Sequence, residues 1–294
     1  MENRWRRWWK FLIPLLVLSF LMILMDSCMQ FRMSKSEINE YFSNKDIKGT
    51  LHHYKVGKRV INYLAVGDST LPLVVFIHGS PGSLSAFIDF MADTALLKRA
   101  QLVTVDRPGF GASNFGYAEP SLQKQAALLR PILELNKKQR PIILVGHSLG
   151  GPLIARMAMD FPELIDGLVM VAPSIDPQLE PHEWFRGPLA TPFLKWILPR
   201  SLRASNDEIY KLKPELEEMI PLWSKIRANT IVIQGTKDDL VPMENAAFAK
   251  KMLINAPVNL VMIEDMNHFI PWRKPEVITK AVVEQLELFK MHSN

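Results

Sequence analysis

The sequence has very little cysteine and none of the common metal-binding or cofactor-binding motifs. Cys28 is the only cysteine among 294 residues, so an intrachain disulfide and a cysteine-based zinc site are both excluded. No H-E-x-x-H motif, paired-cysteine motif or dinucleotide-type glycine motif occurs, and we expect neither a metal nor an organic cofactor. Internal repeats are absent too, which excludes a solenoid.

Basic charge is scarce beyond the N-terminus. The net charge is +5, and the first ten residues supply +3 of it through Arg4, Arg6, Arg7 and Lys10 against Glu2. The rest of the chain is therefore close to neutral. A nucleic-acid-binding protein carries its basic excess on the folded domain, so we expect no nucleic-acid partner.

A basic and aromatic segment, Trp5–Lys10, precedes the apolar run Phe11–Met25. The run is somewhat shorter than the roughly 20 residues that span a bilayer as a helix. It lies at the upper end of the roughly 7–15 residues of a signal-peptide core. Cations and tryptophans of this kind are typical of the cytoplasmic headgroup region. We therefore expect residues 1–28 to tether the protein to a membrane, with the remaining chain outside the cytoplasm.

Two modes of tethering are compatible with this segment. One is an uncleaved signal anchor, and the other is a lipoprotein signal whose cleavage makes Cys28 the lipidated first residue. Asp26 fits poorly in the small, apolar box that precedes a lipidated cysteine, which favours the anchor. Residues 29–50 are polar, and we expect them to form a partly helical spacer.

Short runs rich in β-branched residues alternate with helical stretches over residues 51–290. Runs of this kind are typical of strands buried in a parallel sheet, and an antiparallel hairpin through Gly57 opens the series. The sequence therefore predicts an α/β fold with a doubly wound, mostly parallel sheet of eight strands. The expected strands are Leu51–Val56, Arg59–Val66, Leu73–Ile77, Leu102–Val105, Ile142–Val145, Leu168–Val171, Ile231–Ile233 and Leu260–Ile263.

Helices are expected between these strands, together with one longer insertion. Residues 176–227 are rich in proline and tryptophan and too long for an ordinary loop, so we expect a small helical cap there. The other expected helices are Ser85–Met91, Leu122–Lys138, Leu149–Asp160, Glu244–Leu253 and Pro275–Lys290.

The segment Gly146–Gly150 (GHSLG) lies between an expected strand and an expected helix. A G-x-S-x-G motif in this context is typical of a nucleophile on a sharp strand-to-helix turn. Glycine is needed on both sides because the backbone comes close there. Ser148 is therefore the candidate nucleophile.

A second loop, His78–Gly82 (HGSPG), follows the expected strand Leu73–Ile77. Acyl transfer needs two N–H donors for the developing oxyanion. We expect these donors to be the N–H groups of Leu149 and Ser80, because Pro81 has none. His78 precedes the nucleophile in the chain and is expected to be a buried turn residue.

The remaining catalytic candidates lie near the C-terminus. His268 follows the last expected strand and is the candidate base, since the expected chain order is serine, acid, histidine. Asp238 and Asp239 follow the strand Ile231–Ile233, and either could orient the imidazole. Asp176, after the sixth strand, is a further alternative for the acid.

Taken together, residues 51–290 resemble the α/β-hydrolase superfamily. Besides the serine motif, Asp106–Gly111 (DRPGFG) with Ser113 is similar to a structural turn of that family. The resemblance implies Asp238 as the acid, three residues after Gly235, and His268 as the base. It is specific for fold and mechanism rather than for substrate.

The resemblance implies a serine hydrolase, similar to esterases and lipases, that acts on a small-molecule acyl substrate through an acyl-enzyme, and the N-terminal segment adds the membrane tether. A serine at position 148 argues against the epoxide- and halide-processing members, which use aspartate there. The GHSLG motif also differs from the G-x-S-W-G of the proline-releasing peptidases. A non-hydrolytic use of the fold, as a lyase or a binding module, is the alternative.

Overall fold

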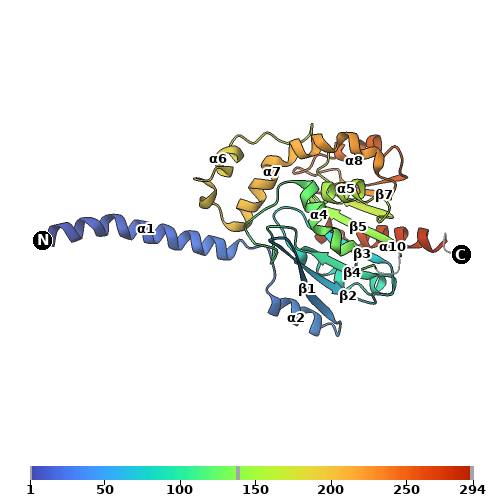
Figure 1. Ribbon diagram of the computed structural model, residues 1–294, viewed down its shortest axis with the longest axis horizontal. Helices are drawn as coiled ribbons and strands as arrows, with labels where there is room; N and C mark the ends of the chain where they lie inside the picture. Colours follow the sequence, from blue (N-terminus) through green and yellow to red (C-terminus); the bar gives the residue numbers. More distant parts are fainter. Residues whose placement is uncertain (1, 137–139, 292–294) are drawn as a thin grey trace.

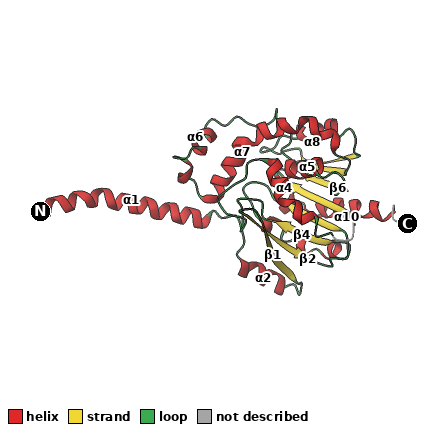
Figure 2. Cartoon of the chain, viewed as in Figure 1, coloured by secondary structure: helices red, strands yellow, loops and turns green. Residues whose placement is uncertain are grey.

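A sheet of eight strands forms the body of the protein, with helices on both faces (Figures 1 and 2). The computed structural model describes residues 2–136 and 140–291. Every predicted strand is present, with each end shifted by at most two residues. The strands are β1 (Gly49–Val56), β2 (Arg59–Val66), β3 (Leu73–Ile77), β4 (Gln101–Val105), β5 (Ile142–His147), β6 (Gly167–Val171), β7 (Asn229–Gly235) and β8 (Val258–Ile263).

The strand order is β1-β2-β4-β3-β5-β6-β7-β8. The pairs β1–β2 and β2–β4 are antiparallel, and the other pairs are parallel. In the central pair, β3 and β5, Ile77 lies opposite Gly146. The predicted doubly wound, mostly parallel α/β sheet is therefore confirmed, and the carboxyl ends of β3 and β5 lie side by side.

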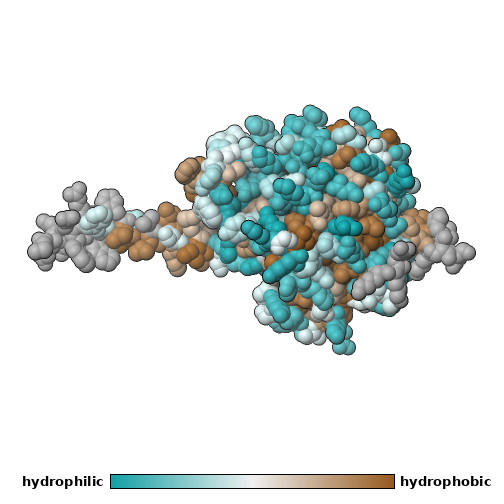
Figure 3. All heavy atoms as spheres, viewed as in Figure 1, coloured by the Kyte–Doolittle hydropathy of each residue, from teal (hydrophilic) through white to brown (hydrophobic). Residues whose placement is uncertain are grey.

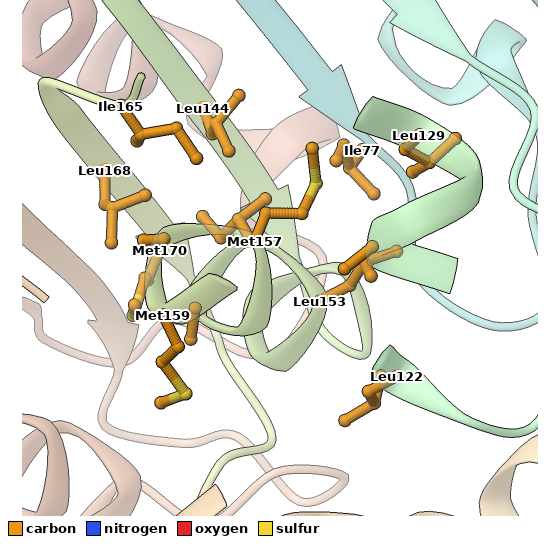
Figure 4. Close-up of a cluster of buried hydrophobic side chains, with 14 of the residues drawn as sticks. Ile77, Leu122, Leu129, Leu144, Leu153, Met157, Met159, Ile165, Leu168 and Met170 are labelled. Atoms are coloured by element: carbon orange, nitrogen blue, oxygen red, sulfur yellow. The ribbon is translucent and has the colours of Figure 1, made fainter. Parts of the chain in front are cut away.

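Alternation along the central strands divides the core into two layers. In β3, Val75 and Ile77 join the cluster on one face, whereas Val74 and Phe76 join the cluster on the other. Successive side chains of a strand face opposite sides, so strands covered on both faces are apolar throughout. Figure 4 shows part of the first cluster, in which Met157 and Leu153 pack against the sheet.

Ten α-helices occur within the described residues, joined by four short 3₁₀ segments. They are α1 (Glu2–Cys28), α2 (Lys35–Ser43), α3 (Thr94–Leu97), α4 (Leu122–Leu133), α5 (Gly150–Asp160), α6 (Arg186–Ala190), α7 (Arg200–Met219), α8 (Glu244–Met252), α9 (Ile270–Arg273) and α10 (Pro275–Met291). The 3₁₀ segments are η1 (Leu84–Phe87), η2 (Phe90–Ala92), η3 (Lys195–Ile197) and η4 (Ile220–Lys225).

Two helix predictions need correction. Residues 85–91, expected as one α-helix, form η1 and the start of η2, because Ser83 caps a tight turn in which the Ile88 N–H bonds to the Ser85 carbonyl. The helix expected to reach Lys138 ends at Leu133, beyond which Asn136 accepts a hydrogen bond from the Arg140 N–H. The last part of that expectation, residues 137–138, lies outside the described residues.

The predicted spacer is partly packed onto the domain. Ser34 and Glu37 form a capping box that starts α2, which satisfies N–H groups that the first helical turn leaves without partners. On the inner face of α2, Ile38 and Phe42 are buried in the second core cluster. Residues 29–50 therefore contribute side chains to the core.

The insertion between β6 and β7 is helical, as predicted, and consists of α6, η3, α7 and η4. On the inner side of α7, Leu212, Leu216 and Met219 are buried in the first core cluster. The outer part exposes large apolar side chains, among them Trp184 at 80% and Phe193 at 91%. The cap is thus anchored through α7 and apolar on its outer surface.

The helix α1 extends away from the sheet (Figure 1). It exposes apolar side chains around its circumference, including Leu16, Phe20 and Ile23. Within the described residues, no helix meets the combined length and apolar character required for crossing a membrane. Apart from Trp8, the side chains of the predicted basic flank, Trp5–Lys10, lie outside the described ones.

Candidate active site

Ser148 occupies a strained turn directly between β5 and α5. Its φ is +55°, in the left-handed region that residues with a side chain rarely adopt. The Ser148 N–H donates to the Val171 carbonyl at 2.9 Å, and its carbonyl accepts from the Gly151 N–H at 2.8 Å. These bonds hold the turn, and they place the hydroxyl group at the carboxyl end of β5 and the start of α5.

The glycines around Ser148 are sterically required. A Cβ on Gly146 would lie 2.4 Å from the Gly150 carbonyl oxygen. A Cβ on Gly150 would lie 2.3 Å from the Ile77 carbonyl oxygen at the end of β3. Real Cβ atoms do not approach backbone this closely, so only glycine lets the turn fold against the neighbouring strand.

His268 and Asp238 are brought together after β8 and β7, respectively. His268 Nδ1 lies 2.8 Å from Asp238 Oδ2, and both residues are buried, with 6% and 9% of their surfaces exposed. A carboxylate only accepts hydrogen bonds. The proton is therefore on Nδ1, and Nε2 is available as a base.

Asp238 is held as a carboxylate by several donors. Its Oδ1 accepts from the N–H groups of Leu240 at 3.0 Å and Val241 at 2.8 Å. Burial alone would raise the pKa of Asp238, but the bonds from His268 and from these N–H groups outweigh it and lower the pKa. The acid is thus kept charged while largely removed from water.

The structure distinguishes among the three candidate acids. Asp238 contacts His268, whereas Asp239 is exposed and forms no hydrogen bond with any other described residue. Asp176 accepts from the Gln178 N–H through its Oδ1, and its own N–H donates to Asn245. Only Asp238 therefore lies where it can orient the imidazole.

Ser148 and the loop after β3 are in direct contact. A Cβ on Gly79 would lie 2.9 Å from the Ser148 Cβ. Within the part of the chain that the structure describes, neither the Ser80 N–H nor the Leu149 N–H donates to a protein acceptor. Both predicted oxyanion donors are therefore unpaired beside the nucleophile, as an oxyanion site requires.

No hydrogen bond joins Ser148 Oγ to His268 Nε2 among the described residues. Such bonds are often long in ligand-free enzymes and shorten when substrate binds. The two residues are connected through His147, whose backbone continues into Ser148. Its ring centroid lies 4.7 Å from that of His268.

His147 is a site residue that the sequence did not indicate. Its Nε2 lies 3.0 Å from the His268 carbonyl oxygen, to which it donates, and Trp272 packs edge-on against its ring. Burial, reinforced by the nearby His268, lowers the pKa of His147 to about 3. His147 is thus neutral at ordinary pH and supports the His268 backbone. His147 is the first x of the G-x-S-x-G motif, a position that the motif leaves open, so the motif did not predict this role.

His78 is a buried turn residue, as predicted. It has no exposed surface, its Nδ1 lies 2.7 Å from the Gly79 carbonyl, and its Nε2 accepts from the Arg107 N–H at 3.1 Å. Burial lowers the pKa of His78 well below its usual range, and the charge of Arg107 acts in the same direction. His78 is therefore neutral and fixes the shape of the loop.

A buried ion pair connects this loop to the cap. Arg107 donates to the carbonyls of His78 at 2.9 Å and Gly79 at 3.0 Å. Its two terminal nitrogens bond to both carboxylate oxygens of Glu208 on α7, at 2.8 and 2.9 Å. Burial raises the pKa of Glu208, and the Arg107 charge opposes that rise. The sequence predicted that Arg107 is part of a structural turn, and it did not predict any role for Glu208.

The rest of the DRPGFG turn is structural, as expected. Asp106 accepts from the Leu84 and Ala112 N–H groups at 2.8 Å each. A Cβ on Gly111 would lie 2.0 Å from the Asp106 carboxylate. Among the described residues, no group of three or more His, Cys, Asp or Glu side chains is arranged to hold a metal ion.

The family model described as the alpha/beta hydrolase fold matches residues 72–204 of the chain. This segment contains β3, the loop His78–Gly82 and the turn Gly146–Gly150 with Ser148. The chain has the α/β-hydrolase fold. Its eight-stranded sheet and its cap insertion after β6 agree with that assignment.

Relatives of this α/β hydrolase include enzymes of several substrate classes. The mouse (Mus musculus) sn-1-specific diacylglycerol lipase ABHD11 is 34% identical over 36% of this chain, which corresponds to only 34% of the lipase's own length. The proline iminopeptidase PfmaB of Pestalotiopsis fici is 24% identical, over 76% of this chain and 95% of that protein.

A solved structure described as a membrane phospholipase A, a bacterial virulence factor, has a TM-score of 0.65 and 18% identity. The match covers 97% of this chain and 99% of that one. At this identity the likeness shows the fold alone. Together with the family match, these comparisons support hydrolase activity.

The buried pair generates a stability prediction. Glu208→Gln leaves Arg107 buried without a countercharge, and we expect the free energy of unfolding to fall by about 3 kcal/mol. Urea denaturation followed by circular dichroism measures this change. The control is Glu217→Gln, an exposed residue of the same helix, for which we expect less than about 0.5 kcal/mol. Equal stabilities of the two variants would contradict a structural role for the pair.

Proposed function

We propose that this α/β hydrolase is a membrane-tethered serine hydrolase that cleaves an ester or a related acyl bond. The hydrogen bond between His268 and Asp238, placed beside the strained Ser148 turn, is the observation that carries the proposal. It supplies an oriented base next to a candidate nucleophile, which is the arrangement that acyl transfer through a serine needs.

In the proposed mechanism, Ser148 Oγ attacks the acyl carbonyl carbon while His268 Nε2 takes its proton. The carbonyl oxygen becomes an oxyanion that accepts from the N–H groups of Leu149 and Ser80. Collapse of this intermediate breaks the ester bond, and His268 gives its proton to the leaving alkoxide. His268 then takes a proton from water as the water oxygen attacks the acyl-enzyme. It gives that proton to Ser148 Oγ as the acyl–Oγ bond breaks and the carboxylic acid leaves.

Asp238 acts on this sequence through His268. Each proton that His268 accepts makes its imidazole positively charged, and the buried carboxylate stabilises that charge while holding the proton on Nδ1. An apolar acyl chain is the favoured substrate, because the cap above the sheet exposes large apolar side chains. The diacylglycerol lipase to which part of the chain is similar supports the same substrate class.

The membrane tether is part of the proposal. Its support is the apolar run of residues 11–25 and the exposed apolar side chains around α1, which are unfavourable in water. The match to the membrane phospholipase covers 97% of this chain and therefore includes part of the 27-residue α1. Localisation outside the cytoplasm follows from the predicted orientation of the basic flank.

We expect Ser148→Ala to abolish labelling by a fluorophosphonate probe and to lower ester turnover by several orders of magnitude, because no nucleophile remains to form the acyl-enzyme. Gel fluorescence and hydrolysis of a short p-nitrophenyl ester measure the two effects. Ser224→Ala, at an exposed serine of η4, is the control and should match the unaltered protein. Wild-type turnover by a folded Ser148→Ala protein would end the proposal. A labelled wild-type protein that releases a non-hydrolytic product would instead be a lyase.

The adjacent aspartates provide a second test. Asp238→Asn keeps the shape but favours the wrong imidazole tautomer, so we expect turnover to fall by about ten-thousandfold. Asp239→Asn alters an exposed side chain and should leave turnover nearly unchanged. Steady-state kinetics at neutral pH compare the two variants. Full activity of Asp238→Asn would remove Asp238 from the proposed mechanism.

The tether is tested by fractionation. We expect the full-length protein to sediment with membranes, and a chain starting at Lys35 to remain in the supernatant with esterase activity. Cys28→Ser separates the two modes, since Cys28 is free and exposed. A lipoprotein would lose its lipid mass in this variant, whereas a signal anchor would be unaffected. Full-length protein in the soluble fraction would refute both modes.

A further inference from the structure

A second cavity, well outside the hydrolytic site, carries concentrated positive charge. Its volume is about 390 Å³, and it opens between the β1–β2 turn, the loop of residues 114–118 and the cap. Four cations line it, Lys58, Arg59, Lys195 and Arg203, against the single carboxylate of Asp207. We call it the basic cavity.

Most of this charge is uncompensated. Arg59 forms an ion pair at 3.6 Å with Glu119. For Lys58, Lys195 and Arg203, no carboxylate oxygen lies within 4.0 Å in the described part of the chain. Of these three only Arg203 is buried. Asp207 and Asp26 act on its charge from beyond contact distance, whereas buried charges are ordinarily paired directly. The lining therefore favours an anion.

Arg203 is the central residue of the basic cavity. Only 5% of its surface is exposed, and within the described residues its side chain forms a single hydrogen bond, from Nε to the Gly116 carbonyl at 3.3 Å. Its guanidinium stacks on the Trp196 ring, with 4.2 Å to the ring centroid. The stacking fixes the guanidinium plane and leaves its terminal nitrogens for a ligand. A planar guanidinium pairs with phosphate oxygens through two parallel bonds.

The basic cavity lies at the base of α1. Three residues before Arg203 on α7, Arg200 donates to Asp26 in the last turn of α1, at 2.7 and 2.8 Å. Phe115, in the loop that lines the cavity, lies under the guanidinium groups of both Arg32 and Arg200. The helix and the loop that contribute lining residues therefore contact the end of α1 and the segment that follows it.

The surface around the basic cavity is apolar and aromatic. Trp184, Phe193 and Ile197 are exposed on the cap, and Figure 3 shows apolar surface on α1 and at the neighbouring edge of the domain. Aromatic side chains combined with cations are typical of the lipid headgroup region. With α1 in the bilayer, the cavity would lie at the depth of the phosphate groups.

We propose that the basic cavity binds the phosphate of an anionic phospholipid headgroup. This ligand class satisfies the three unpaired cations, and its acyl chains extend toward the exposed aromatic side chains. The binding site goes beyond the proposed hydrolase function and uses none of its residues. Its placement at the headgroup level rests on the proposed membrane tether, but lipid binding and ester hydrolysis are tested separately.

The test is calorimetric titration of the full-length protein in a neutral detergent with three probes. They are dihexanoyl phosphatidylglycerol, dihexanoyl phosphatidylcholine with the same chains but a neutral headgroup, and inorganic phosphate. We expect phosphatidylglycerol to bind at least about tenfold more tightly than either other probe, and more weakly as salt is added.

The variant Lys58→Gln/Lys195→Gln removes two cations at partly exposed positions, so it should fold normally, and we expect its affinity for phosphatidylglycerol to fall about tenfold or more. Arg203→Lys keeps the charge but loses the two parallel bonds and should also weaken binding. The matched control is Lys213→Gln, an exposed lysine of α7 outside the cavity, which should bind like the unaltered protein.

Equal affinities for the two lipids, or no loss in the double variant, would overturn the proposal. Inorganic phosphate binding as tightly as phosphatidylglycerol would overturn the lipid assignment and make the basic cavity a site for free phosphate. The double variant should hydrolyse a soluble ester at the normal rate, and Ser148→Ala should still bind the lipid. Loss of hydrolysis with intact lipid binding would therefore count only against the hydrolase proposal.

Discussion

The parallel pairing of β3 with β5 is the constraint on which the candidate active site depends. Ile77 lies opposite Gly146 in this pair, so the loop after β3 and the turn after β5 begin at the same level of the sheet. The turn then folds back so closely that a Cβ on Gly150 would meet the Ile77 carbonyl. Without glycine at these positions, Ser148 and the Ser80 and Leu149 N–H groups could not converge on one point.

Buried charge is present at this edge of the sheet in two forms. Asp238 is largely removed from water, but N–H donors and His268 stabilise its carboxylate. Arg107 and Glu208 neutralise each other inside the domain, and Arg107 also holds two carbonyls of the β3 loop. A buried pair of this kind contributes little net stability but is costly to break. Its effect here is to fix the loop relative to the cap.

The cap therefore connects three features of the molecule. Through Glu208 it contacts the loop that bears the Ser80 N–H, and through Arg200 it contacts the end of α1. Arg203, between them on α7, lines the basic cavity. Because all three residues lie on one helix, a shift of α7 relative to the sheet would alter the loop after β3, the contact with α1 and the basic cavity together.

The sequence by itself determined the eight strands, the helical insertion and the turn that carries Ser148, because all of these follow from local periodicity and from the few residues that a tight turn tolerates. For the acid it left Asp238, Asp239 and Asp176 as candidates, of which the family resemblance implied Asp238. The contact of Asp238 with His268 is visible only in the tertiary structure, because it joins residues 30 positions apart. Glu208 and Arg107 are 101 positions apart, and no sequence pattern around either residue predicts that they pair. For residues 85–91 the local pattern was misleading. It predicted an α-helix, whereas the Ser83 cap and the surrounding core impose 3₁₀ turns. Long-range contacts are decided by how whole elements pack, and a local pattern does not contain that information.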